Sequence, residues 1–421
     1  MITRISDRVS EVDVGPCRLL LLPVDVPQVV SWAGSIATYP NLERGEALVQ
    51  TLTADLLDKG TRLRDRFALS DELERRGARL TINASGLRIS FRGRTLEHDM
   101  PEVMALLAEI LTQPLLNESE FVKAKARLNA SLEHARDSTA QRAQGALSRR
   151  LYCTNHPAFL PALEDTLQAL ATLSVDDIHT FYKGHMGPND LVMAMTGDLN
   201  LDACVQAAEA TFTHWAGQST QATHVESASP EAPGQVQIPM KEKPALDVRL
   251  GHAIRLRRTD ADWLPLHVAT YILGGNFSSR LMKRVRQELG LTYGISAHLQ
   301  GLADGAEGYY STSMSLGAAD LARGLDATRS VIEEFVREGP SAKELEEKKT
   351  TIAGAYQVGL STTGSIAGRL HSNAVRGLEV AYLDEFVNEV KSLTLERVRE
   401  VLSKHISPAA LHTVVAGTLP E

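Results

Sequence analysis

The stretch RQELGLTY, residues 286–293, has one strong hydrogen-bond donor, Arg286, before Gly290 and another, Tyr293, after it. The guanidinium of Arg286 and the phenol of Tyr293 can each donate to an oxygen atom of a bound ligand. An ordinary interpretation competes with this one: Tyr293 faces the core from a strand, and Arg286 is a cation on a helix surface. Composition alone favours the ordinary interpretation.

Other candidate chemistry in the chain is weak. The 13 histidines include no H-x-x-H, H-E-x-x-H or H-x-x-E-H pair, the spacings that place two metal ligands on one helix face. The glycine-rich stretch ILGGNFSSRL (272–281) lacks the lysine of a phosphate-binding loop. It is interpreted as a loop before a helix, capped by Ser278 or Ser279. The three cysteines lie far apart and form no C-x-x-C pair, so each is expected to be a small buried residue.

Two elements must position Arg286 and Tyr293. Residues 278–289 carry an apolar stripe and predict an amphipathic α-helix, which Gly290 ends in the left-handed conformation. Residues 291–299 alternate in polarity and predict a strand. His252 and His298 are expected on strands near the pair, and the sequence assigns them no role beyond packing.

The chain contains one long internal duplication. Residues 173–199 align without a gap to residues 393–419, and His185 and Gly197 fall on His405 and Gly417. Each copy has the pattern of a helix, a proline-marked turn, an apolar strand and a glycine. A repeat of this length indicates a duplicated domain rather than a solenoid.

The duplication predicts two homologous domains in tandem, at 1–216 and 236–421. Residues 217–235 are poor in apolar side chains and are interpreted as a linker. Strands are expected at 17–24 and, joined by a tight turn, within 79–93, with a helix at 100–113. Strand pairs joined by turns, with helices in separate runs, favour an α+β fold in which each domain is a mainly antiparallel sheet packed with helices.

Bulk properties exclude some classes of function. The net charge is −8 and there is no long basic run, so no nucleic-acid partner is expected. No stretch approaches the roughly 18 apolar residues of a transmembrane helix, and the N-terminus lacks the apolar core of a signal peptide. We therefore expect a soluble chain, cytoplasmic in the absence of a visible signal, or periplasmic in a bacterium if a leader has been removed.

Residues 273–297, LGGNFSSRLMKRVRQELGLTYGISA, resemble the second-domain signature of the insulinase-like, or pitrilysin-type, zinc peptidases. This family includes the mitochondrial processing peptidase. Residues 155–199 resemble the end of its first domain, and its members have the same duplicated architecture. The resemblance thus extends over nearly the whole chain and implies that Arg286 and Tyr293 are the family's Arg/Tyr pair.

The chain departs from the family where the metal is bound. Active members carry H-x-x-E-H in the first domain, and the equivalent run here is TLTADLLDKGT (51–61). The two zinc histidines fall on Thr51 and Asp55, the catalytic glutamate on Ala54, and the third zinc ligand near Ser131. These side chains do not supply two imidazoles, a carboxylate ligand and a base that activates water. The resemblance therefore implies that this chain holds no zinc and no other cofactor.

Some family members work as two-chain enzymes, in which one chain carries H-x-x-E-H and the other carries the Arg/Tyr pair across a closed chamber. The resemblance implies that Arg286 and Tyr293 position a peptide or unfolded segment beside the zinc of a homologous partner. Oriented donors of this kind stabilise charge that develops in the transition state. Two alternatives stay open: a structural subunit, like the core proteins of the respiratory cytochrome complex, and a peptide-binding module without a hydrolytic partner.

Overall fold

The computed structural model describes residues 4–215, 217, 228 and 231–420, which form two compact units. Unit 1 comprises Met1–Asn129, Gln168–His224 and Ala355–Phe386, and unit 2 comprises Ala130–Leu167, Val225–Gly354 and Val387–Glu421. Of the linker predicted at 217–235, residues 218–227, 229 and 230 lie outside the described residues. The domain boundaries at 216 and 236 divide the sequence repeat and stay a prediction, since each compact unit takes segments from both halves.

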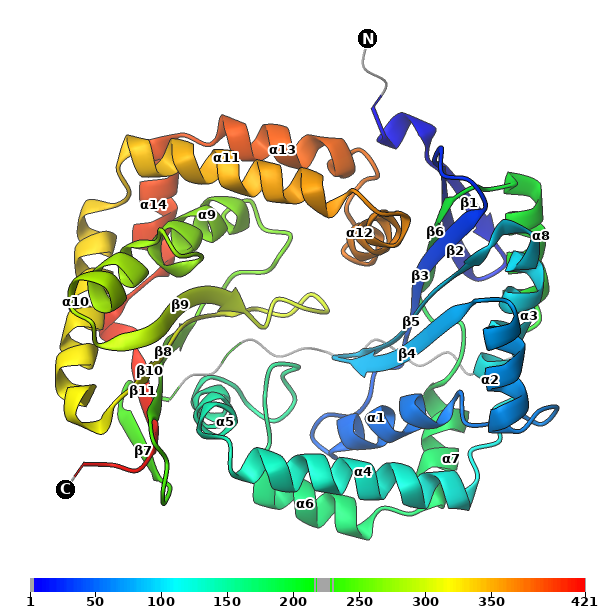
Figure 1. Cartoon of the computed structure of the whole chain (residues 1–421), viewed down its shortest axis with the longest axis horizontal. Coiled ribbons are helices and arrows are strands. Elements are labelled where there is room, and N and C mark those ends of the chain that lie inside the picture. The colour runs from blue at the N-terminus through cyan, green and yellow to red at the C-terminus, as the bar shows by residue number, and fades with distance from the viewer. Residues whose placement is uncertain (1–3, 216, 218–227, 229–230, 421) are drawn as a thin grey trace. The chain divides into compact units, whose positions relative to one another are not determined.

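Unit 1 is built on a six-stranded sheet with the order β1-β2-β6-β3-β5-β4 (Figure 1). Within this sheet β2 and β6 run parallel, and the other neighbours are antiparallel. The strands are β1 (Ser10–Val14), β2 (Cys17–Pro23), β3 (Val29–Ala37), β4 (Arg79–Ser85), β5 (Arg88–Leu96) and β6 (Leu191–Gly197). The helices that lie wholly in unit 1 are α1 (Glu46–Leu56), α2 (Arg66–Arg75), α3 (Met100–Thr112), α7 (Val175–His185), α8 (Leu201–Phe212) and α12 (Thr363–Val375).

The four consecutive leucines of β2 explain how this sheet is packed. Leu19 and Leu21 join one apolar cluster with residues of α3 and α8, whereas Leu20 and Leu22 join another with residues of α12. Successive side chains of a strand point to opposite faces of the sheet. A continuous apolar run is therefore what a strand needs when helices cover both faces.

Unit 2 is built on a five-stranded sheet with the order β7-β11-β8-β10-β9, in which β7 and β11 are parallel and the other pairs antiparallel (Figure 1). The strands are β7 (Gln235–Pro239), β8 (Leu246–Ala253), β9 (Thr292–Gln300), β10 (Tyr309–Leu316) and β11 (His412–Gly417). The helices are α5 (Thr139–Leu151), α9 (Trp263–Gly274), α10 (Leu321–Glu338) and α14 (Leu395–His405). The boundary between the units falls within α4 (Glu118–Arg136), α6 (Leu163–Thr172), α11 (Ala342–Gly359) and α13 (Tyr382–Ser392).

The predicted α+β class, with mainly antiparallel sheets packed with helices, is confirmed, and the repeat is visible in the backbone. The helix and strand α7 and β6 recur as α14 and β11. Gly197 and Gly417 close the two copies at φ +139° and φ +141°, where side chains are strained. A Cβ on Gly197 would lie 2.0 Å from the carbonyl oxygen of Val29, so this position also lacks room for any other residue.

Each compact unit contains one helix from the half of the sequence that contributes most of the other unit. Helix α12, from the second half, packs on β3 and β6 of unit 1, and α5, from the first half, packs on β8 and β11 of unit 2. In unit 2 this contact buries Ala143 and Leu147 of α5 against Val414 and Ala416 of β11. None of the helices in the described part of the chain combines the length and apolar character of a membrane span.

Candidate functional site

Arg286 lies on a π-helical turn, η3 (Met282–Glu288), where the sequence predicted an α-helix. The amide of Leu289 donates to the carbonyl of Arg284 at 3.2 Å, which is the i→i−5 bond of a π-helix. Gly290 follows at φ +64°, as predicted for the helix end. Because a π turn contains an extra residue, Leu289 leaves the buried stripe of Leu281 and Val285 and is only half-buried.

Tyr293 is 95% exposed, so the interpretation that it faces the core is wrong. It lies on β9, an edge strand of unit 2, whose predicted alternation holds at Ile295 and Ala297, both buried. The alternation fails at Tyr293 because the register shifts: Thr292 pairs with Leu316 and Ile295 with Met314, which leaves Tyr293 and Gly294 opposite a single residue of β10. This is a β-bulge, a feature that redirects side chains.

The hydroxyl of Thr292 holds the bulge in place. It donates to the carbonyl of Ser315 on β10 at 2.6 Å, and it accepts the amide of Gly294 at 3.1 Å. Thr292 itself is buried, with 7% of its surface exposed. Gly294 was the available sequence signal, since an isolated glycine in a strand marks bulges, but the signal does not say which side chain turns outward.

Phe277 joins this surface and was not among the site residues predicted from the sequence. Its ring is 70% exposed, and the guanidinium carbon of Arg286 lies 5.1 Å from the ring centroid. An arginine at this distance from an aromatic face is held by a cation–π interaction. Arg286 is half-buried, so the ring restricts its guanidinium while leaving it accessible.

A buried lysine fixes the loop that carries Phe277. The ammonium of Lys348 donates to Asn276 Oδ1 at 3.1 Å and to Ser278 Oγ at 2.5 Å, and only 4% of this lysine is exposed. Burial lowers the pKa of Lys348. Neither Ser278 nor Ser279 caps the following helix as predicted: Ser278 binds Lys348, and Ser279 Oγ has no partner among the described residues.

An ion pair anchors the start of the same segment. Arg280 makes two hydrogen bonds to the carboxylate of Glu344, at 2.7 and 2.8 Å. Burial alone would raise the pKa of Glu344, but the hydrogen bonds from Arg280 and Ser341 lower it to about 2. Phe277 and Arg286 thus lie on a loop and turn that are anchored by the buried Lys348 and by the half-buried pair of Arg280 and Glu344.

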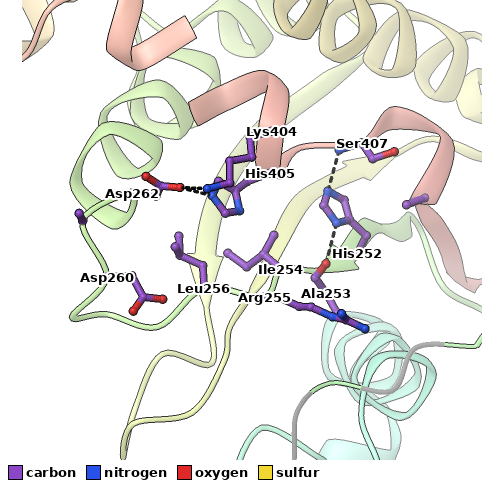
Figure 2. Close-up of a pocket in the computed structure, with 12 residues that line it drawn as sticks. His252, Ala253, Ile254, Arg255, Leu256, Asp260, Asp262, Lys404, His405 and Ser407 are labelled. Carbon is purple, nitrogen blue, oxygen red and sulfur yellow. Dashed lines mark hydrogen bonds and ion pairs between the residues drawn. The ribbon is translucent and has the colours of Figure 1, made fainter. Parts of the chain in front are cut away.

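His252 has a structural role. Its Nδ1 donates to the carbonyl of Ala253 at 2.9 Å, and its Nε2 accepts the amide of Ser407 at 3.2 Å (Figure 2). Burial lowers the pKa of His252 and, with the nearby charge of Arg249, also that of His298. Both ring nitrogens of His252 are therefore occupied in a neutral imidazole.

A cavity of about 670 Å³ in unit 2 is lined by His252 and by the residues around Asp262 (Figure 2). The carboxylate of Asp262 binds Lys404 Nζ and His405 Nε2, each at 2.7 Å, and also Arg397. The repeat copy of His405, His185, likewise lies 3.4 Å from the carboxylate of Glu46 in unit 1. In each unit a histidine at a helix end thus lies beside an acid at the start of another helix, so this pair is a structural feature that the two copies share.

Two of the three positions expected for zinc ligands, Thr51 and Asp55, lie elsewhere, on α1 of unit 1. Thr51, Ala54 and Asp55 line a cavity of about 340 Å³ together with Arg127 of α4. Thr51 Oγ1 donates to the carbonyl of Ala47 at 2.9 Å, and the carboxylate of Asp55 binds the guanidinium of Arg127 at 2.8 Å. Ser131, one turn further along α4, is exposed.

These residues do not fit a zinc ion. Zinc takes deprotonated nitrogen, sulfur or carboxylate ligands, and the cavity offers a methyl group, a hydroxyl bonded to its own helix and one carboxylate. The guanidinium of Arg127 already pairs with that carboxylate. Throughout the described residues, no group of three or more His, Cys, Asp or Glu side chains is placed to hold a metal ion.

Comparisons with known proteins point to one family. Residues 52–160 match the profile "Insulinase (Peptidase family M16)", and residues 172–352 match "Peptidase M16 inactive domain". The chain is 22% identical to the "Non-peptidase homolog YmxG" of Helicobacter pylori over 84% of this chain and 81% of the relative. It is 24% identical to the "Uncharacterized zinc protease YmxG" of Bacillus subtilis over 81% of each.

The fold is also that of solved structures. The crystal structure of a peptidase M16 inactive domain from Pseudomonas fluorescens superposes with a TM-score of 0.87 at 22% identity, over 98% of both chains. The periplasmic protease PqqL of Escherichia coli superposes with a TM-score of 0.80 at 14% identity, over 100% of this chain and 46% of that one. At these identities the superpositions establish the fold.

Proposed function

Because the chain belongs to the M16, or insulinase, family of peptidases, we propose that it is the Arg/Tyr-bearing, non-zinc-binding subunit of a heterodimeric zinc endopeptidase. Arg286 and Tyr293 bind the backbone of a peptide or unfolded segment, and a homologous partner with H-x-x-E-H supplies the zinc. The chain alone cleaves nothing.

The observation that carries this proposal is the exposure of Tyr293. A tyrosine that is 95% exposed on an edge strand contributes little to the stability of its own unit, since its ring buries almost no apolar surface. A β-bulge has to be maintained by Thr292 and Ser315 to present it. Such a feature is better explained by contact with another molecule than by packing.

The chemistry of the pair suits a peptide. A guanidinium offers several N–H donors and a phenol offers one O–H donor, and both match the carbonyl oxygens of an extended chain. Donors fixed before the substrate arrives stabilise negative charge on oxygen without reorganising. The guanidinium of Arg286 is positioned in advance by its cation–π contact with Phe277. The loop that carries Phe277 is positioned by the hydrogen bonds of Lys348.

The first half of the chain supports the proposal that this chain binds the peptide while a partner chain supplies the zinc. The cavity at Thr51, Ala54 and Asp55 has no free ligand set, and Arg127 places a positive charge in it. A water molecule activated by zinc therefore has to come from another chain.

A second candidate is a non-catalytic scaffold or peptide-binding module of the same fold. It is favoured by the name of the Helicobacter pylori relative, a non-peptidase homolog. This candidate retains the peptide-binding surface but has no hydrolytic partner.

Isolating the chain from its native extract distinguishes the two candidates. Under the first, it co-purifies with a stoichiometric partner of similar size that carries H-x-x-E-H, and the complex cleaves a fluorogenic peptide until a chelator is added. A partner without zinc or cleavage, or no partner at all, would favour the scaffold or module instead. The chain purified alone serves as the inactive control.

A further inference from the structure

A second cavity in unit 2, of about 490 Å³, lies apart from the residues assigned above. It is lined by residues from the end of α4, from α5, from the start of α6 and from strand β8. Most of its wall is apolar, contributed by Leu132, Ala135, Leu160, Pro161 and Leu163. Cavities of this size and character bind small organic molecules.

Arg249 of β8 gives this apolar cavity a charge. The side chain is half-buried, and within the described residues it forms no ion pair or hydrogen bond; its Nε is shielded from solvent without a partner. The nearby carboxylate of Asp247 instead accepts the hydroxyl of Thr139 at 2.6 Å. A charged group removed from water without a hydrogen-bonding counterion is costly, so an anion in the cavity would stabilise it.

Two further guanidinium groups line the same cavity. Arg149 donates to the carbonyls of Leu160 and Pro161 at 3.2 and 3.3 Å, and Arg142 binds the carboxylate of Glu164 at 2.6 Å. Burial, and then the charge of Arg142, lower the pKa of Arg149, which Glu164 and Asp165 oppose only in part. Arg142 thus has a carboxylate partner and Arg149 has two carbonyl partners, whereas Arg249 has neither kind of partner among the described residues.

We propose that this cavity binds a carboxylate attached to an apolar group. Arg249 binds the carboxylate, since a guanidinium matches its two oxygens, and the walls from α4, α5 and α6 enclose the apolar part. Two sources share this chemistry: the C-terminus of a peptide that ends in an apolar residue, and a free apolar acid. The lining of this cavity does not include Arg286 or Tyr293. The proposal can therefore be tested separately from the proposed peptidase function.

Calorimetric titration of the full chain tests the proposal with three probes: N-acetyl-leucyl-phenylalanine, the same dipeptide as its C-terminal amide, and octanoate. We expect at least one of the two acids to bind saturably. The dipeptide amide should bind at least about tenfold more weakly than that acid, because the amide cannot form the charged hydrogen bond to Arg249. Tighter binding of the dipeptide acid identifies a peptide C-terminus as the source, and tighter binding of octanoate identifies a free acid.

The variant Arg249→Gln should weaken acid binding by about tenfold or more and leave amide binding unchanged. Arg323→Gln is the matched control, because Arg323 is a well-exposed arginine of the same unit that pairs with Asp320. Equal affinities for acid and amide, no saturable binding of either acid at millimolar concentration, or an Arg249→Gln variant that binds the acid normally would each overturn the proposal. The acid–amide comparison on the unmodified chain decides the matter even if that variant does not fold.

Discussion

At the scale of single residues, the exposed tyrosine depends on a threonine hydroxyl. Thr292 bonds both across to Ser315 and within its own strand to Gly294, and this fixes two residues of β9 opposite one of β10. Tyr293 turns outward as a result. The same hydroxyl therefore connects the folding of the strand to the presentation of the phenol.

Replacing either donor should reduce catalysis by the complex without separating its chains. We expect Arg286→Ala and Tyr293→Phe to lower kcat/KM by roughly 10²–10³, the usual effect of removing one donor that stabilises the transition state. Steady-state kinetics and gel filtration of the complex measure the two effects. Arg284→Ala is the control, because Arg284 lies on the same turn but pairs with Glu288; unchanged kinetics in both test variants would restore the ordinary interpretation of the pair.

Phe277 should influence activity through Arg286. Phe277→Ala removes an exposed cation–π interaction, worth about 0.5–1 kcal/mol, so we expect kcat/KM to fall by roughly two- to fivefold and stability to change little. Phe277→Trp retains an aromatic face and should restore most of the activity. If Phe277→Ala lowers activity equally in an Arg286→Ala background, then the ring does not act through Arg286.

For the helices and strands, sequence patterns predicted the features that depend on one segment alone. They did not predict the features that depend on how one strand pairs with the next. The repeat, the left-handed Gly290 and the burial of Ile295 follow from spacing alone. The outward turn of Tyr293 does not, because it requires the register of β9 on β10. The loop of Phe277 similarly depends on a contact outside its own segment, because Lys348, which is remote in the sequence, bonds the residues on either side of Phe277.

Helix α12 is held to its sheet by a buried polar contact as well as by apolar packing. His371 Nε2 lies 2.8 Å from Ser35 Oγ, which also accepts Arg88 Nε at 2.8 Å. The serine hydroxyl therefore donates to an unprotonated nitrogen. Burial, followed by the charges of Arg88, Arg92 and Arg376, lowers the pKa of His371 to about 3.

This histidine should make the chain sensitive to acid. The unfolded state takes up the proton below about pH 6.5, whereas the folded state does so only near pH 3. The contribution to stability is thus full at neutral pH and falls as pH decreases from about 6.5 to 3, by roughly 2 kcal/mol at pH 5. Urea unfolding at pH 7, 6 and 5 measures how the free energy of unfolding changes with pH. His371→Asn should reduce this slope by the equivalent of about one proton. An unchanged slope in that variant would contradict the assignment to His371.

At the scale of the whole molecule, neither half of the sequence makes a complete compact unit. Unit 1 needs α12 from the second half and unit 2 needs α5 from the first. A helix that covers a distant sheet leaves no local signal beyond its apolar residues, so the repeat alone did not predict this exchange. The duplication specified two sheets but not which helices cover them.

The exchange implies that neither half folds well alone. Residues 1–216 lack α12, so the apolar face of Leu20, Leu22 and Val192 loses its partners Ile366 and Leu370. Each of these side chains is worth about 1.5–3 kcal/mol when buried. We expect the isolated half to show no cooperative unfolding transition, and co-expression of 1–216 with 236–421 to restore one. Cooperative unfolding of residues 1–216 alone, measured by circular dichroism, would show that α12 is dispensable.

The positions that the family resemblance equates with zinc ligands allow a last test of why this chain should hold no zinc. The tag-free chain should contain no stoichiometric zinc by elemental analysis. Thr51→His, Ala54→Glu, Asp55→His and Ser131→Glu together restore the residue types of active relatives, but they leave the guanidinium of Arg127 in the cavity without the carboxylate it now binds. A cation close to a bound Zn²⁺ repels it, so adding Arg127→Met should tighten zinc binding by about tenfold or more. If both sets bind zinc equally, the charge of Arg127 does not oppose the metal, and the absence of zinc ligands alone accounts for the expected lack of zinc.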